Sequence, residues 1–303
     1  MNSGSKIKFA FFGSSRLSVI VLDELEKTGL IPACIVTTPD KPKGRKLEIT
    51  PNVVKEWATN KKIRIYDPAK LDETFIEMLE KESCDLFIVA SYGKIIPKSI
   101  IDLPRHKTLN IHPSLLPEYR GPSPLPSAML DNAKRTGVTI MRLDEEMDHG
   151  PIVAQEETIV AEWPVYEDFE EMMARKGAQL LARTLPDWVA GKIKEIEQDH
   201  SQATYTKKIT KEDGLIDSAD IASNAPQEKA YTAFRKIQAF HEWPQAYFFI
   251  ERDGKKIRVK VTQASFKKDP ANKNGKLIIE KVIPEGKKEM PYEDFVRGYL
   301  KTA

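Results

Sequence analysis

The spacing of apolar residues in the first two-thirds of the chain alternates between the pattern of buried strands and that of amphipathic helices. Four short apolar runs suit parallel strands buried on both faces, and they span residues 7–12, 33–37, 86–90 and 108–111. Segments with helical spacing lie between them at residues 17–27, 53–60 and 74–82. Two more strand-like runs, 137–143 and 152–159, precede a helix-like stretch at 166–189. This order predicts an α/β fold, a Rossmann-like, mostly parallel sheet with helices on both faces.

The pattern changes after residue 189. Residues 190–205 are polar and are predicted to form a linker. Beyond them, residues 227–240 have helical spacing, and short strand-like segments follow at 246–250, 256–261 and 276–279, with turn signals between them. We therefore expect a first domain over residues 1–189, a linker over 190–205, and a small β-rich, barrel-like domain of the OB type over 206–303.

Composition places the chain among ordinary globular proteins, since 41% of its 303 residues are hydrophobic and 30% are charged. No apolar run approaches the roughly 20 residues needed to cross a bilayer, and the first residues lack the apolar stretch of a signal peptide. Cys34 and Cys84 each lie in an apolar strand-like run, which favours buried reduced thiols over a disulfide or a metal site. We expect a cytoplasmic protein that needs no metal.

The net charge of +2 conceals an uneven distribution. Residues 206–303 carry 20 basic and 14 acidic side chains, whereas residues 1–205 carry 27 and 31. A basic module attached to a slightly acidic one is typical of proteins with a polyanionic partner such as a nucleic acid. Lysine-rich surfaces also serve solubility alone, and charge by itself leaves both interpretations open.

Ligands of open α/β sheets bind outside the carboxyl ends of the strands, so residues that follow strands are the first candidates for a site. The first predicted strand ends at Phe12-Gly13-Ser14-Ser15, just before a predicted helix. This turn could bind an anion or a substrate carboxylate at the helix start, or it could simply be a tight turn that needs glycine. No G-x-G-x-x-G pattern follows, so we do not expect a nicotinamide cofactor.

A second group of polar residues follows the strand predicted at 108–111. Asn110 and His112 are two residues apart, which places both side chains on the same side of the chain, and Pro113 then ends the strand. Asp148 lies in an acidic turn before another predicted strand. On residue types alone, a catalytic group, a packed histidine and a turn aspartate remain alternatives.

Flanking motifs make this region specific. Asn110-Ile111-His112-Pro113-Ser114-Leu115-Leu116-Pro117, then Tyr119-Arg120-Gly121, then Gly137-Val138-Thr139 and Met147-Asp148-His149-Gly150 resemble the signature of the folate-dependent formyltransferases. The resemblance implies that Asn110, His112 and Asp148 are catalytic and that 10-formyltetrahydrofolate is the formyl donor. It is strongest over residues 86–155. Two positions depart from the family pattern, Pro126 where Gln is usual and His149 where Thr or another small or polar residue is usual.

The same resemblance implies a folate site. Ala90-Ser91-Tyr92-Gly93-Lys94-Ile95-Ile96-Pro97 is similar to the family segment whose backbone lines the pteridine pocket. The residues expected to contact the folate are Tyr92, Gly93, Lys94, Ile95, Ile96, Ser114, Leu115, Leu116 and Pro117.

Other segments resemble the methionyl-tRNA formyltransferase branch of this family. They are the basic loop at 37–46, residues 204–209 at the entry to the C-terminal domain, and residues 237–244 and 286–290 within it. The expected substrate and tRNA contacts are Gly13, Ser14, Lys41, Lys43, Arg45 and Lys46. The resemblance implies formyl transfer to the α-amine of initiator methionyl-tRNA, and we expect a monomer.

The main alternative is a sugar-nucleotide N-formyltransferase, which uses a similar catalytic domain and the same folate donor on an amino sugar. It would not require the basic loop or a positively charged C-terminal domain. A glycinamide ribonucleotide formyltransferase is generally a single domain of about 200 residues. A formate-releasing hydrolase would not need an acceptor-binding module, and a non-catalytic tRNA-binding protein would not need the three catalytic residues.

Overall fold

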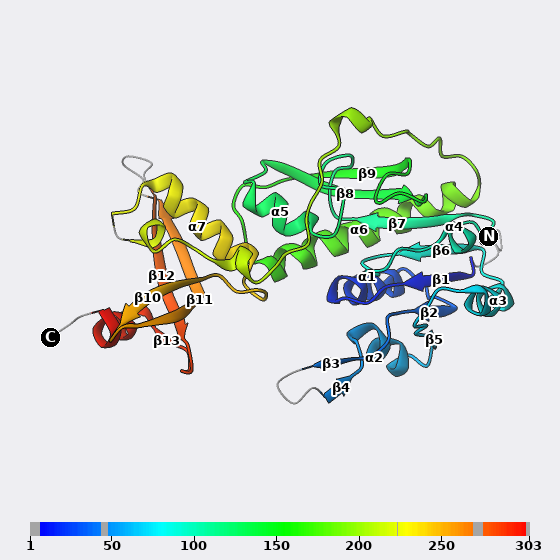
Figure 1. The fold of residues 1–303 in the computed structure, drawn as a ribbon. Helices are drawn as coiled ribbons and strands as arrows, with labels where there is room; N and C mark the ends of the chain where they lie inside the picture. Colours follow the sequence, from blue (N-terminus) through cyan, green and yellow to red (C-terminus); the bar gives the residue numbers. More distant parts are fainter. Residues whose placement is uncertain (1–6, 44–47, 223, 269–274, 301–303) are drawn as a thin grey trace. The chain divides into compact units, whose positions relative to one another are not determined.

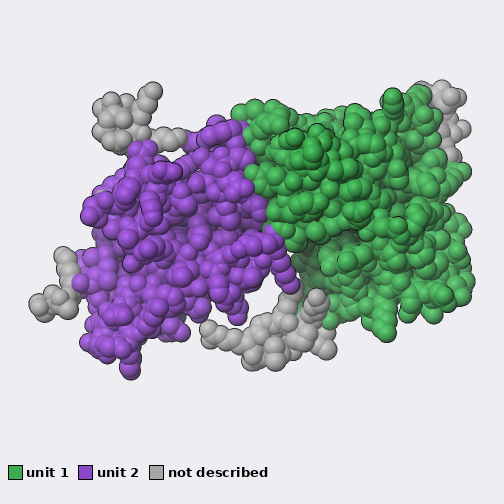
Figure 2. Space-filling view, turned by 45° about the horizontal axis from the view of Figure 1, so that its top comes forward, with its two compact units in different colours: residues 1–124, 135–159, 170–206 green, residues 125–134, 160–169, 207–303 purple. Residues whose placement is uncertain are grey.

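The computed structural model describes residues 7–43, 48–222, 224–268 and 275–300 of the chain. The chain divides into two compact units, coloured separately in Figure 2. Unit 1 comprises residues 1–124, 135–159 and 170–206, and unit 2 comprises residues 125–134, 160–169 and 207–303. Within the described residues, no helix is both long and apolar enough to cross a membrane.

Unit 1 is built on a seven-stranded sheet in the order β5-β2-β1-β6-β7-β8-β9 (Figure 1). The strands are β1 (Phe9–Phe12), β2 (Cys34–Val36), β5 (Arg64–Tyr66), β6 (Leu86–Val89), β7 (Thr108–His112), β8 (Arg135–Arg142) and β9 (Ile152–Ile159). The first five in this spatial order run parallel, and β8 and β9 extend the sheet in antiparallel fashion. The predicted mostly parallel sheet is confirmed.

Helices cover both faces of this sheet. They are α1 (Arg16–Lys27), α2 (Val53–Asn60), α3 (Glu73–Glu82), α4 (Lys98–Ile101) and α6 (Tyr166–Val189), of which residues 170–189 belong to unit 1. Side chains at Ser15, Asn52 and Asp72 cap the first three of these helices by accepting backbone N–H groups that the helix itself leaves unpaired. The predicted helix at 53–60 is therefore found at the same residues, and the predicted helices at 17–27 and 74–82 each begin one residue earlier.

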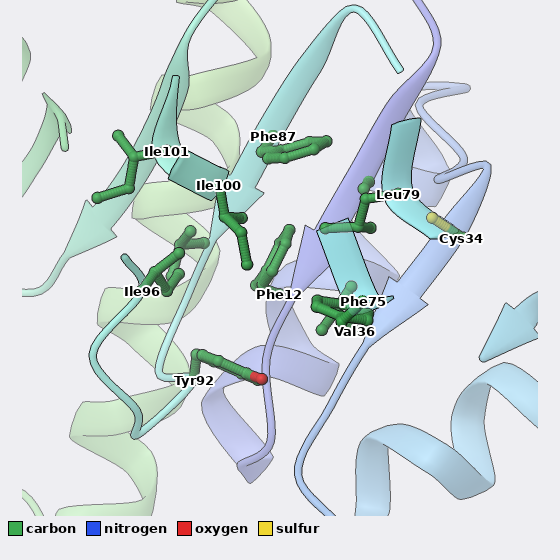
Figure 3. Packing of buried hydrophobic residues seen from close by; sticks show 12 residues of the cluster. Phe12, Cys34, Val36, Phe75, Leu79, Phe87, Tyr92, Ile96, Ile100 and Ile101 are labelled. Atoms are coloured by element: carbon green, nitrogen blue, oxygen red, sulfur yellow. The ribbon is translucent and has the colours of Figure 1, made fainter. Parts of the chain in front are cut away.

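One face of the sheet packs against α3 and α4 through a continuous apolar cluster (Figure 3). Phe12 lies at its centre, with its ring centroid 5.3 Å from that of Phe87 and 5.6 Å from that of Tyr92. On the opposite face α6 approaches closely, because a Cβ at Gly177 would lie 2.5 Å from the Ile111 side chain. Helices therefore pack against both faces of the sheet near the carboxyl ends of its central strands.

Unit 2 contains a four-stranded antiparallel sheet in the order β10-β11-β12-β13. Its strands are β10 (Tyr247–Arg252), β11 (Lys255–Lys268), β12 (Gly275–Pro284) and β13 (Met290–Pro291). Asp253 and Gly254 join β10 to β11 with φ values of 51° and 69°, as a two-residue hairpin turn requires. The predicted β-rich C-terminal domain is confirmed, although β11 and β12 extend well beyond the segments expected at 256–261 and 276–279.

One helix covers the inner face of the unit 2 sheet. It is α7 (Gln227–Ala239), which contributes Ala230, Ala233 and Ile237 to a core shared with Phe248, Val259 and Val282. Among the described residues, the remaining helices are α5 (Pro124–Leu130), α8 (Tyr292–Phe295) and the short helical turns at His200–Gln202, Glu212–Gly214, Ser218–Ile221 and Val296–Leu300.

The basic loop contains a small hairpin that the sequence pattern did not indicate. Its strands are β3 (Lys41–Lys43) and β4 (Glu48–Thr50), which pair antiparallel. The expected tRNA contacts Arg45 and Lys46 lie outside the described residues, and so do the side-chain environments of Lys41 and Lys43.

Candidate active site at the carboxyl end of the unit 1 sheet

Strand β7 carries Asn110 and His112 to the carboxyl end of the central strands. Asn110 pairs in register with Val89 of β6 on one side and Met141 of β8 on the other. His112 is the last residue of the strand, because Pro113 has no N–H to continue the ladder. Both side chains come from the same side of β7, and the two residues are only 8% and 4% exposed.

Each ring nitrogen of His112 faces an oxygen. Nε2 lies 3.0 Å from the carbonyl oxygen of Tyr119, and Nδ1 lies 3.5 Å from Oδ1 of Asp148. A carbonyl only accepts hydrogen bonds, so Nε2 carries the hydrogen in this contact and Nδ1 is the nitrogen presented to the carboxylate. The Nδ1–Oδ1 distance exceeds that of a hydrogen bond, as is common in catalytic pairs before substrate binds.

Asp148 is held in place by its own turn before β9 and by the loop that follows β7. Its Oδ2 accepts the backbone N–H of Gly121 at 2.7 Å, and its backbone has a φ of 51°, in the left-handed region. Two residues later the chain passes so close to β8 that a Cβ at Gly150 would lie 2.0 Å from the carbonyl oxygen of Arg142. The turn is therefore tight, and it brings Asp148 to His112 across 36 residues of sequence.

The Asn110 amide is not used by the protein itself. Within the described part of the chain its side chain has no hydrogen-bond partner, although the residue is almost fully buried. An amide that the protein leaves unpaired can donate its N–H to a ligand oxygen. Asn110 thus offers an N–H donor beside the His112–Asp148 pair.

The segment after β6 leaves the sheet next to Asn110 with an irregular backbone. Ser91 and Gly93 have φ values of 50° and 76°, and Ile95 is 89% exposed. In the described residues, the backbone groups of Gly93, Ile95 and Ile96 form no hydrogen bonds. Free backbone donors and acceptors beside an exposed apolar side chain suit a flat heterocycle with polar edges.

Comparison with known proteins establishes the family. Residues 6–185 match the family model described as formyl transferase, and residues 208–300 match that of the formyl transferase C-terminal domain. This chain belongs to the formyl transferase family.

Two curated relatives that align over nearly the full length are methionyl-tRNA formyltransferases. The methionyl-tRNA formyltransferase of Listeria monocytogenes serotype 4b is 36% identical over 307 residues, covering 96% of this chain and 95% of that protein. The methionyl-tRNA formyltransferase of Dictyoglomus thermophilum is 35% identical, covering 97% of each chain.

Solved structures share the fold at low sequence identity. An N-formyltransferase from Helicobacter canadensis, solved with folinic acid and dTDP-3-aminofucose, gives a TM-score of 0.63 at 16% identity over 90% of this chain and 98% of that one. The methionyl-tRNA formyltransferase from Clostridium thermocellum gives 0.57 at 16% identity over 92% and 98%.

Several residues expected to contact folate in this formyl transferase serve the protein itself. The hydroxyl of Ser114 is buried and donates to the carbonyl of Glu118 at 2.6 Å. The carbonyl of Leu116 accepts from the Gln155 amide at 2.8 Å, and the Lys94 ammonium donates to the carbonyl of Pro68 at 2.8 Å. These contacts hold the segment after β6 and the loop after β7 through hydrogen bonds within the protein.

Tyr92 differs from its neighbours because its side chain points into the core. The ring packs against Phe12, and the hydroxyl is buried without a hydrogen-bond partner among the described residues. Burial disfavours the phenolate and raises the pKa of Tyr92 to about 12. The backbone of Tyr92, rather than its hydroxyl, is the part nearest to the irregular segment, and its carbonyl accepts from Ser14 Oγ at 2.9 Å.

The backbone N–H groups of Gly13 and Ser14 already donate hydrogen bonds within the protein. The Gly13 N–H donates to the carbonyl of Val36 at 3.0 Å, and the Ser14 N–H donates to the carbonyl of Ser91 at 3.2 Å. A Cβ at Gly13 would lie 2.7 Å from Phe11 and Ser18 side-chain atoms. The geometry favours a tight turn that needs glycine over an anion-binding cradle, and it links the end of β1 to the segment after β6.

A polar network beside the site was missed by the sequence reasoning. Arg120 is 1% exposed, and its guanidinium donates to the side chain of Gln198, 78 residues later in the chain. Composition predicts a polar linker at residues 190–205, because nothing in it indicates burial. In the structure residues 195–206 pack against the loop that contains Arg120 and against β9, all within unit 1.

Proposed function

We propose that this chain transfers the formyl group of 10-formyltetrahydrofolate to the α-amine of methionine esterified to initiator tRNA. The convergence of Asn110, His112 and Asp148 at one end of the sheet carries the chemical part of this proposal. The name shared by its full-length relatives at 35–36% identity supports the acceptor.

The three side chains would divide the work of formyl transfer. When bound, 10-formyltetrahydrofolate supplies an electrophilic formyl carbon. Asn110 would donate its amide N–H to the formyl oxygen as negative charge develops there, and one such donor is typically worth about 2.7–4 kcal/mol of transition-state stabilisation. Asn110 suits this role because its amide has no competing partner in the described chain.

The attacking amine would lose its proton to the His112–Asp148 pair, and the folate nitrogen would leave with a proton as its bond to the formyl carbon breaks. A free α-amine has a pKa of about 7.7–8.0, so a large part of it is protonated at neutral pH and needs an acceptor. The Tyr119 carbonyl holds Nε2 of His112, which leaves Nδ1 and the neighbouring carboxylate to receive and hold the proton. The His112 and Asp148 side chains need not move far, because both are largely buried and their backbone is held in place.

Folate binding is proposed for the two irregular segments that border the trio. Gly93, Ile95 and Ile96 would offer backbone groups and an apolar side chain to the pteridine ring, since these groups have no other use in the described chain. Tyr92, Lys94 and the loop of Ser114, Leu115, Leu116 and Pro117 would shape the pocket from below, through the internal contacts described above.

Recognition of tRNA is proposed for the basic loop and the C-terminal domain. Lys41, Lys43, Arg45 and Lys46 would contact phosphates near the acceptor end. Lysines and arginines on the unit 2 sheet would contact phosphates further along the tRNA. The proposed division of the chain is a catalytic domain at 1–189, a connecting segment at 190–205 and a tRNA-binding domain at 206–303. We further propose that the enzyme acts as a cytoplasmic monomer.

One assay separates this function from transfer to an amino sugar. Purified protein with 10-formyltetrahydrofolate is offered charged initiator tRNA and, in parallel, UDP-amino sugars. We expect formyl-methionyl-tRNA and no formylated sugar. Formylation of the sugar alone would overturn the proposal.

A further inference from the structure

Residues 195–206, here called the strap, lie across both loops that carry the catalytic groups. At one end, Glu195 forms a two-pronged ion pair with Arg142 at 2.7 and 2.9 Å. Ile196 and Ile152 exchange backbone hydrogen bonds at 2.8 and 2.9 Å. At the other end, Thr204 receives the backbone N–H groups of Tyr119 and Arg120 at 2.7 and 2.8 Å. The strap therefore connects the Asp148 turn to the loop whose Tyr119 carbonyl holds His112.

Gln198 occupies the middle of this connection and is only 4% exposed. Its Nε2 donates to the backbone carbonyls of Asp148 and Gly150, at 3.0 and 2.6 Å. Its Oε1 accepts from Nε and Nη2 of Arg120, at 3.1 and 2.7 Å. A guanidinium can only donate, so Arg120 fixes which end of the amide faces the Asp148 turn.

Burying the Arg120 guanidinium at this position costs free energy of hydration. Its guanidinium is buried, and among the described residues none of its hydrogen-bond partners is a carboxylate: they are Gln198, the hydroxyl of Tyr205 at 3.3 Å and Nδ1 of His200 at 2.8 Å. A buried charge without an opposite charge loses hydration that such contacts only partly replace. Stability alone therefore does not account for Arg120, whereas orientation of Gln198 does.

The turn that contains Asp148 has a strained backbone, which the hydrogen bonds from Gln198 stabilise. Asp148 has a left-handed backbone, which is unfavourable for a residue with a Cβ. Gln198 bonds the carbonyls on both sides of His149, and the His149 ring stacks on His200 with centroids 4.1 Å apart and planes 3° from parallel. The turn is thus held from outside while its carboxylate faces His112.

We propose that Gln198, oriented by Arg120, is a positioning residue for formyl transfer that keeps the Asp148 carboxylate against His112. The inference rests on the proposed function of the trio. Neither Gln198 nor Arg120 contacts the reacting groups, so their effect acts through Asp148. Misplacement of a catalytic group by about 1 Å can cost roughly 100-fold in rate, which sets the scale of the expected effect.

The decisive variant is Gln198→Glu. Glutamate has nearly the same shape and still accepts from Arg120, but it replaces the Nε2 donor with an oxygen facing two carbonyl oxygens. We expect kcat for formylation of methionyl-tRNA to fall about 10- to 100-fold, while KM for the tRNA and for the folate changes less than about threefold. A defect in folding alone would lower the active fraction and would not change the pH profile of kcat, whereas a displaced Asp148 would shift it.

The matched control is Gln202→Glu, the same substitution four residues later at an exposed position of the strap. Urea unfolding of both variants measures whether either loses stability. If Gln198→Glu does not fold, Gln198→Asn removes the reach of the amide without adding charge and is expected to give the same split between kcat and KM.

Parallel assays separate failure of this inference from failure of the proposed function. If His112→Ala remains active, the proposed site itself is wrong, whatever Gln198 does. If His112→Ala is inactive but a folded Gln198 variant keeps the kcat and pH profile of the Gln202→Glu control, the positioning role is overturned.

Discussion

The carboxyl end of the unit 1 sheet and the outer face of the unit 2 sheet use polar residues in opposite ways. At the unit 1 site His112 and Arg120 are almost fully buried and the Asp148 side chain is only 13% exposed, and each of the three has defined partners within the protein. On β11 of unit 2, Lys256 and Arg258 point away from the face on which Val259 is buried.

Lys256 and Arg258 on β11 lie over aromatic rings, whereas other cations of unit 2, such as Lys207 and Lys281, pair with carboxylates. The Lys256 ammonium lies 4.3 Å from the ring centroid of Phe249, and the Arg258 guanidinium lies 5.6 Å from that of Tyr247. Cations held in this way keep their charge available to an incoming polyanion. Under the proposed function, formyl transfer depends on one fixed geometry, whereas tRNA recognition depends on exposed charge spread over a surface.

The largest effect is expected from His112→Ala. Loss of a general acid–base group typically costs 10²- to 10⁴-fold in rate, and kcat for methionyl-tRNA formylation should fall on that order. Affinity for tRNA should stay within about twofold, because His112 belongs to the buried region of fixed geometry. Single-turnover formylation and filter binding measure the two quantities. His106→Ala is the control, and retained turnover in His112→Ala would contradict the proposed site.

The second largest loss of kcat is expected from Asn110→Ala. Removal of one donor to a developing oxyanion typically lowers kcat about 10²- to 10³-fold. Because the Asn110 amide has no protein partner in the described chain, its removal should not lower the free energy of unfolding, as measured with urea. A loss of stability with unchanged kcat would show that the amide serves the fold instead.

Substitutions on the exposed face of the unit 2 sheet should change the salt dependence of tRNA binding rather than the rate of formyl transfer. Replacing Lys256 and Arg258 with Gln should weaken tRNA binding about tenfold at low salt and leave kcat at saturating tRNA unchanged. The slope of log K against log salt concentration should decrease by about 0.7–0.9 per lost phosphate contact. Lys81→Gln on α3 of unit 1 is the control, and an unchanged slope in the double variant would remove these residues from the tRNA interface.

The smallest effect is expected from Tyr92→Phe. Burial raises the pKa of Tyr92 to about 12 in the folded protein, so the unfolded chain loses this proton near pH 10 while the native protein keeps it. Stability from this group is therefore present below pH 10 and is lost between pH 10 and 12, by on the order of 2–3 kcal/mol.

Replacement by Phe should abolish that part of the alkaline loss and should be nearly neutral at pH 7, because the hydroxyl has no partner among the described residues. Urea unfolding at pH 7 and at pH 11 measures both effects. An equal alkaline loss in the parent and the variant would show that another group titrates there.

Sequence periodicity located most of the elements because it reports local burial. The helix at Val53–Asn60 and the strand at Ile152–Ile159 were predicted to the residue, since caps, turn residues and apolar spacing all agree there. The strand Arg64–Tyr66 was missed because it is a three-residue, half-exposed edge whose only signal is its pairing with β2. The hairpin at 41–50 was missed because a run of lysines has no strand period.

The sequence by itself determined the candidate trio, because Asn110, His112 and Asp148 lie in motifs that resemble a family signature. It also determined the alternating order of strands and helices. Only the tertiary structure decided that residues 195–206 belong to the site, through hydrogen bonds between Arg120 and Gln198 that span 78 residues. Such contacts leave no local pattern, because a buried glutamine and an exposed one have the same composition and only the fold places one beside the catalytic turn.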